Sequence, residues 1–113
     1  MCGIAGLWKF NGERLNRVEL EKMANTLKHR GPDGEGFWVR EDQRLGFAHR
    51  RLKIIDLSAQ ADQPFFSPDG KYVIVLNGEI YNYIELKRKL QQQGYSFLTT
   101  SDTEVLLYMY ITH

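Results

Sequence analysis

Cys2 is the residue whose type and position are best suited to covalent chemistry. Removal of Met1 would leave a thiol and a free α-amine on one residue. An α-amine has an ordinary pKa of about 7.7–8.0, so it can take the proton of its own sulfur, as in N-terminal nucleophiles. The alternative is a buried cysteine in an edge strand, the usual place of a lone cysteine. Both interpretations stay open on position alone.

Asn77 and Gly78 form the second candidate, at the end of the β-branched run 72–76. A side-chain amide beside an unhindered backbone N–H suits an oxyanion that forms when a thiolate attacks a carbonyl carbon. The alternative is a hairpin turn, for which Asn-Gly is a strong signal. The residues after Gly78 lead into a predicted helix instead of a second strand, which weakens the hairpin interpretation.

Arg51 and Asp102 form the third candidate, because a zwitterionic amino acid needs a guanidinium for its carboxylate and a carboxylate for its ammonium. Each has a simpler interpretation. Arg51 belongs to the basic cluster 49–53, which is typical of a solvated surface. Asp102 is an acid in the first turn of a predicted helix, where it is favoured in any case. Separately, the two residues decide nothing.

The bulk composition limits the other function classes. The 113 residues suit one globular domain, with 42% hydrophobic and 26% charged residues. The formal net charge of +1 gives no reason to expect nucleic acid or an anionic membrane as a partner. One cysteine and three histidines have no metal-site spacing, and no glycine-rich nucleotide motif is present. No apolar run approaches a membrane span of roughly 18 residues. We expect a cytoplasmic protein without a metal or cofactor in this chain.

Hydrophobic periodicity and capping residues predict the elements that must position these candidates. Strands are predicted over residues 1–10, 37–39, 45–49 and, most clearly, 72–76, with a turn-rich loop over 31–36. Three pairs that resemble capping boxes predict helix starts, at Asn16/Glu19, Asn82/Glu85 and Ser101/Glu104. The first two helices are expected to end near Gly31 and Gly94. Inward-facing residues are predicted to include Ile84, Leu86 and Leu90 in the second helix, and Val105, Leu106 and Met109 in the third.

Six segments occur in order along nearly the whole chain: 1–6 (MCGIAG), 29–34 (HRGPDG), 48–56 (AHRRLKIID), 63–65 (QPF), 76–82 (LNGEIYN) and 101–106 (SDTEVL). Together they resemble the class II glutamine amidotransferases. Glu79, which follows the Asn-Gly pair, favours the asparagine synthetase branch over the aminosugar and purine branches. Order and spacing make this resemblance more specific than any single motif.

The resemblance implies an α+β fold, the N-terminal nucleophile hydrolase four-layer αββα sandwich, incomplete in this chain. It implies hydrolysis of L-glutamine to glutamate and ammonia through a thioester on Cys2. The implied roles are an oxyanion hole from Asn77 and Gly78, binding of the substrate carboxylate by Arg51, and binding of the α-amino end by Glu79 and Asp102. Backbone groups around Leu52, Ile54 and Ile55 are implied to line the pocket.

Length is where the chain departs from this family, whose glutaminase domains continue beyond 113 residues. We expect residues 1–113 to be the N-terminal part of such a domain, with the ATP-dependent synthetase domain, and its ATP and Mg²⁺, absent. A synthetase domain or second chain that completes the fold is the expected partner, beside L-glutamine. The alternative hypothesis is a truncated, inactive remnant that only binds amino acid or associates with a partner. The acceptor of the ammonia is not encoded in these residues.

Overall fold

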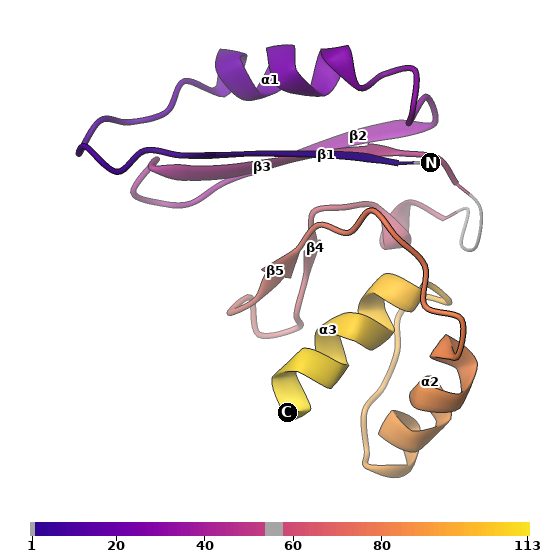
Figure 1. The fold of residues 1–113 in the computed structure, drawn as a ribbon. Helices are drawn as coiled ribbons and strands as arrows, with labels where there is room; N and C mark the ends of the chain where they lie inside the picture. Colours follow the sequence, from indigo (N-terminus) through magenta and orange to yellow (C-terminus); the bar gives the residue numbers. More distant parts are fainter. Residues whose placement is uncertain (1, 54–57) are drawn as a thin grey trace.

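The computed structural model describes residues 2–53 and 58–113 (Figure 1). Its first part is a three-stranded antiparallel sheet of order β1-β3-β2, covered on one face by helix α1. The second part contains a two-stranded ribbon and two helices, which lie on the opposite side of that sheet from α1. The elements of the first part are β1 (Gly3–Trp8), α1 (Arg17–Thr26), β2 (Gly34–Val39) and β3 (Leu45–Arg51). Those of the second part are the short 3₁₀ helix η1 (Ala59–Ala61), β4 (Phe65–Phe66), β5 (Val73–Ile74), α2 (Tyr83–Gln92) and α3 (Asp102–Thr112).

Alternation along the strands decides which face of the sheet α1 covers. Ala48 of β3 is buried with Leu20 and Ala24 of α1, and its cross-strand neighbours Ala5 and Phe37 lie on the same face. The opposite face is apolar as well, and it carries the following side chains: Ile4, Trp8, Trp38 and Phe47. Ile4 is 45% exposed and Trp8 55% exposed, so this second face is only partly covered.

The predicted start of α1 is confirmed, since the side chain of Asn16 accepts a hydrogen bond from the backbone N–H of Val18. The helix ends at Thr26, earlier than expected, and turns lead from there to Gly31. Strand β2 begins at Gly34, inside the segment predicted to be a loop. Gly36 can join the strand because it has no side chain. A Cβ there would overlap the backbone carbonyl of Gln63, which packs directly on β2.

The second part differs more from the sequence prediction. The run 72–76 forms only two ladder residues, Val73 and Ile74, which pair with β4. Helices α2 and α3 begin where predicted and pack on each other through Leu90, Val105 and Tyr108. Ile84 was predicted to face inward, but it is 52% exposed. A capping pattern therefore locates a helix start better than three apolar positions locate its buried face.

The observed elements confirm the α+β class. None of the helices within residues 2–53 and 58–113 has the length and apolar character that a membrane crossing requires.

His49 joins the two parts of the molecule. It lies on β3, is almost completely buried, and its Nε2 donates to the carbonyl of Leu76 at 3.2 Å. Its Nδ1 is the one buried side-chain polar atom without a hydrogen-bond partner among the described residues. Burial lowers the pKa of His49 below its ordinary value. The hydrogen bond to the Leu76 carbonyl opposes this shift in part, and weaker effects of Arg51, which lowers the pKa, and Asp62, which raises it, oppose each other.

This lowered pKa predicts that acid destabilises the fold through His49. Below the ordinary pKa of 6.5, His49 binds a proton in the unfolded chain but stays neutral in the folded chain until the pH falls further. The contribution of His49 is therefore complete above pH 6.5 and is lost as the pH falls from there through the folded-state pKa. We expect the free energy of unfolding, measured by urea titration, to fall between pH 7.5 and 5.5, and to fall less in His49→Gln.

His29 provides the matched control because it is an exposed histidine of the same chain. His29→Gln should keep the pH dependence of the original protein. An equal loss of pH dependence in both variants would contradict the assignment to His49.

Candidate functional site

Cys2 lies one residue before β1, where the antiparallel pairing of Gly3 with Arg50 carries it to the end of β3. Its Sγ accepts from the backbone N–H of Leu52 at 3.3 Å and lies 3.7 Å from the carbonyl oxygen of the same residue. The Cys2 carbonyl accepts from Nε of Arg30 at 3.2 Å. The thiol is partly buried and unbridged. The structure therefore places the predicted nucleophile against the predicted pocket segment at Leu52.

The basic cluster is not a solvated surface. His49, Arg50 and Arg51 are all buried, each with its own partners. Arg50 pairs with Glu35 at 2.5 Å and donates from Nε to the carbonyl of Gly31 at 3.0 Å. Because neighbouring strand residues point to opposite faces, Arg51 lies on the other side of the sheet from Arg50.

Arg51 is held by the segment between β3 and β4. Its Nη1 donates to the carboxylate of Asp62 at 2.5 Å and to the carbonyl of Ser58 at 2.8 Å. These contacts fix the direction of a guanidinium that is only 7% exposed. A guanidinium oriented in this way suits planar recognition of a second carboxylate.

Asp102 is the first residue of α3 and is buried. The start of the helix is set by Ser101, whose hydroxyl accepts from the N–H of Thr103 at 3.1 Å. The Asp102 carboxylate accepts from the backbone N–H of Ile80 at 3.0 Å, through Oδ2. This bond ties the start of α3 to the loop that contains Asn77, Gly78 and Glu79.

Glu104 holds the turn in front of α3, although the sequence suggested a capping box with Ser101. Its carboxylate accepts from the backbone N–H groups of Leu98 and Thr99, at 3.0 and 2.8 Å, and from the Thr99 hydroxyl at 2.7 Å. Glu104 is fully buried, so these three bonds compensate its desolvation. They also fix the approach of the chain to Asp102.

Asn77, Gly78 and Glu79 follow β5 in an exposed or half-buried loop. The peptide just before them is held on both sides. The N–H of Leu76 donates to Oε1 of Gln63 at 2.5 Å, and its carbonyl accepts from His49. Neither His49 nor Gln63 was predicted to have a role in the site. Their only signal was their place in the segments 48–56 and 63–65.

Cys2 contacts Leu52 directly, so these two candidate residues are brought together. Asp102 contacts Ile80, the residue that follows Glu79. Within the part of the chain that the structure describes, no hydrogen bond or ion pair joins Cys2 to Asn77, Gly78 or Glu79. Ile54 and Ile55, predicted to line the pocket, lie outside the described residues.

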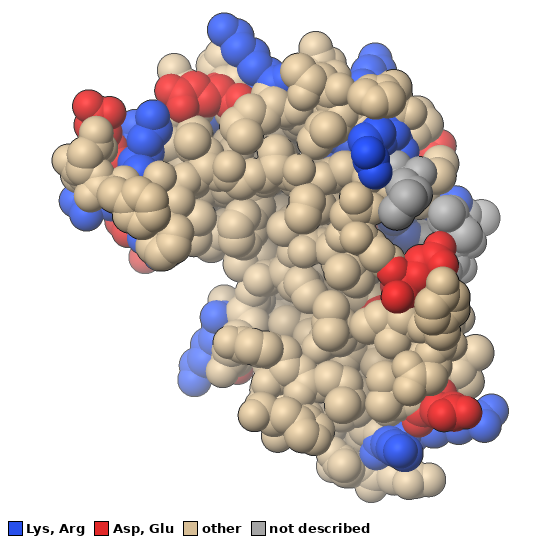
Figure 2. All heavy atoms as spheres, viewed as in Figure 1, with Lys and Arg blue, Asp and Glu red and all other residues tan. Residues whose placement is uncertain are grey.

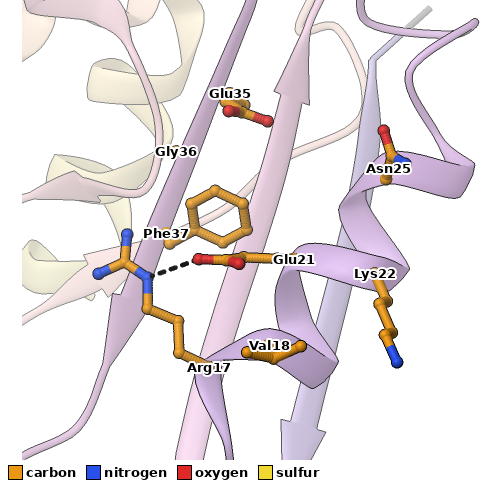
Figure 3. Close-up of a pocket in the computed structure, with 8 residues that line it drawn as sticks. All are labelled: Arg17, Val18, Glu21, Lys22, Asn25, Glu35, Gly36 and Phe37. Atoms are coloured by element: carbon orange, nitrogen blue, oxygen red, sulfur yellow. Dashed lines mark ion pairs between the residues drawn. The ribbon is translucent and has the colours of Figure 1, made fainter.

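Two surface hollows lie away from these residues. Figure 3 shows one between α1 and β2, where the labelled residues include Arg17, Glu21 and Phe37. Arg17 pairs with Glu21 at 3.5 Å and stacks over the Phe37 ring at 5.2 Å. The other hollow lies between β1 and α1. Neither hollow is lined by a candidate residue. The exposed Arg17–Glu21 ion pair contributes at most about 1 kcal/mol to the stability of the fold. We assign no function to them.

The charge distribution and the metal-ligand residues do not suggest another class of site. Figure 2 shows Lys and Arg interspersed with Asp and Glu on the face viewed, in keeping with a net charge of +1. Among the described residues no three His, Cys, Asp or Glu side chains are grouped closely enough to hold a metal ion.

Comparison with known proteins bears directly on this site. The model of the glutamine amidotransferase domain family matches residues 1–113. Asparagine synthetase [glutamine-hydrolyzing] 1 of Bacillus subtilis (strain 168) is 45% identical over 113 residues, covering 97% of this chain and 17% of the relative. Asparagine synthetase [glutamine-hydrolyzing] 1 of Arabidopsis thaliana is 41% identical over 111 residues, covering 97% and 18%. The nodule asparagine synthetase [glutamine-hydrolyzing] of Pisum sativum is 40% identical over 114 residues, covering 100% and 19%.

The chain spans less than a fifth of the length of these three relatives. All three are named as glutamine-hydrolysing enzymes, which agrees with the family match. The chain belongs to the glutamine amidotransferase domain family.

Proposed function

We propose that this chain carries the glutaminase site of an asparagine synthetase-like amidotransferase and hydrolyses L-glutamine to glutamate and ammonia. The observation that carries the proposal is the place of Cys2, directly before β1 with its sulfur against the backbone of Leu52. The family match over the whole chain supports the same chemistry.

Catalysis begins with removal of Met1, which frees the α-amine of Cys2. The amine takes the thiol proton, and the thiolate attacks the side-chain carbonyl carbon of glutamine. The carbonyl oxygen becomes an oxyanion, which accepts hydrogen bonds from the amide of Asn77 and the N–H of Gly78. As this intermediate collapses, the protonated α-amine of Cys2 gives its proton to the leaving nitrogen. Ammonia is released and a thioester remains. Water then attacks the thioester, and glutamate leaves as the thiol is restored.

The two charged ends of the substrate are bound by different elements. Arg51, at the end of β3, binds the α-carboxylate, while Glu79 and Asp102 bind the α-ammonium. Arg51 and Asp102 are buried and already oriented by protein partners, which lowers the entropy cost of binding. Backbone groups of Leu52 line the space between.

We further propose the four-layer αββα fold of N-terminal nucleophile hydrolases, completed by additional polypeptide. The order of α1, the three-stranded sheet, the β4–β5 ribbon and the α2–α3 pair in Figure 1 supports it. The exposed apolar side chains on the second sheet face, Ile4 and Trp8, leave surface for further strands. A synthetase domain that uses ATP and Mg²⁺ would lie outside residues 1–113 and would take up the ammonia.

The role of the nucleophile can be tested by substitution. Cys2→Ala should reduce the release of glutamate and ammonia from glutamine to the level of the buffer blank, because no other side chain supplies the attacking atom. Intact mass must show loss of Met1 in both proteins, since only then is the α-amine free. A processed, soluble original chain that releases no ammonia would instead support a remnant that binds amino acid or a partner without hydrolysis.

The role of Asn77 in binding the oxyanion can be tested in the same way. Asn77→Ala should lower kcat about 10²–10³-fold with a much smaller change in KM, because the lost hydrogen bond acts on the transition state. Steady-state glutaminase kinetics measure both constants. Asn25→Ala, at an exposed position of α1, is the matched control and should leave them unchanged. An Asn77→Ala variant that keeps its kcat would remove Asn77 from the oxyanion hole.

A further inference from the structure

Gln63 is a buried side chain that bonds to two separate parts of the site. It lies between η1 and β4, just before Pro64. Its Oε1 accepts from the N–H of Leu76 at 2.5 Å, and its Nε2 donates to the hydroxyl of Thr103 at 3.1 Å. Leu76 directly precedes Asn77, and Thr103 directly follows Asp102. One amide therefore links the proposed oxyanion segment to the helix start that binds the substrate ammonium.

The backbone of Gln63 is as constrained as its side chain. A Cβ on Gly36 would overlap the Gln63 carbonyl oxygen, so the two backbones are in direct contact. Gly36 is the cross-strand partner of His49. His49 in turn donates to the carbonyl of Leu76. The adjacent strands β2 and β3 thus support both Gln63 and the peptide that it binds.

These contacts leave the Leu76 residue little freedom to rotate. Its N–H is bound by Gln63 and its carbonyl by His49, so a rotation of either neighbouring peptide breaks a partly buried hydrogen bond. Such a rotation would also redirect the Asn77 side chain and the Gly78 N–H. Catalytic donors must be held within about 0.5 Å of their productive positions.

We propose that Gln63 is a positioning residue for amide hydrolysis: it holds the Leu76–Gly78 segment in the orientation that the oxyanion requires and joins it to the start of α3. This inference rests on the proposed glutaminase function and adds a residue to it. Gln63 touches no substrate atom in the proposed mechanism, so its effect runs through Asn77 and Gly78.

The decisive variants remove one or both hydrogen bonds with little change in volume. Gln63→Met removes both, Thr103→Val removes only the acceptor on α3, and Thr103→Ser keeps the hydroxyl. We expect Gln63→Met to lower kcat about 10–100-fold, as misplacement by about 1 Å does. KM should change by less than about 3-fold, because oxyanion donors act on the transition state. Thr103→Val should lie between Gln63→Met and the original chain, and Thr103→Ser should match the original.

Two further measurements separate positioning from general destabilisation. The rate of Cys2 alkylation by iodoacetamide should be unchanged in Gln63→Met, since the Cys2 sulfur contacts the backbone of Leu52, whereas the Gln63 amide bonds to Leu76 and Thr103. Hydrogen–deuterium exchange should rise selectively in the peptide that contains Leu76, Asn77 and Gly78. A parallel loss of kcat, alkylation rate and protection throughout the chain would overturn the proposal, as would unchanged kcat in Gln63→Met.

Failure of the proposed function has a different signature. If the processed original chain releases no ammonia, the glutaminase proposal fails for this chain, and hydrogen exchange decides the role of Gln63. A selective rise at Leu76–Gly78 in Gln63→Met and Thr103→Val, but not in Thr103→Ser, supports the positioning role. Unchanged exchange at that segment in Gln63→Met overturns it. If Gln63→Met does not fold, Thr103→Val provides the same two tests, the change in kcat and the change in hydrogen exchange.

Discussion

The alternation of side chains along the end of β3 is the constraint on which the rest of this structure depends. His49 and Arg51 lie on the face toward the second part of the molecule, while Arg50 lies on the face toward α1. His49 binds the carbonyl of Leu76, directly before Asn77, Arg51 binds the segment between β3 and β4, and Leu52 contacts the Cys2 sulfur. A shift of one residue in register would exchange these faces and separate all three contacts.

Burial of so much polarity has an energetic consequence. Desolvation of a charged group costs several kcal/mol unless partners compensate it. Arg50, Arg51 and Glu104 are compensated by an acid, by backbone carbonyls or by backbone N–H groups. Such bonds add less to stability than apolar packing of similar volume would, but they fix the direction in which each charged side chain points. These buried polar contacts fix the orientation of charged side chains, and a site that stabilises charge depends on such fixed orientations.

Local signals in the sequence predicted much of the fold. Asn16, Asn82 and Ser101 mark the residues before the three α-helices, and the strands predicted over 37–39 and 45–49 lie within β2 and β3. The run 72–76 was overestimated because β propensity does not state how long a partner strand is, and β4 supplies only two residues. The sequence did not indicate that Arg50 and Arg51 are buried, since a basic cluster resembles a solvated surface until its distant partners are known. The role of Gln63 was equally hidden. Its partners lie 13 and 40 residues away, and only the folded chain brings them within bonding distance.

The partly covered second face of the three-stranded sheet also determines how the molecule can be observed. Both tryptophans lie on it, Trp8 opposite Leu45 and Trp38 opposite Phe47, and the Trp38 and Phe47 rings are 5.3 Å apart. The core under α1 contains no tryptophan among its described members. Tryptophan emission, excited at a wavelength that tyrosine does not absorb, therefore monitors the polarity of this sheet face. A blue shift of that emission reports that the face has become covered, and it does so without any introduced label.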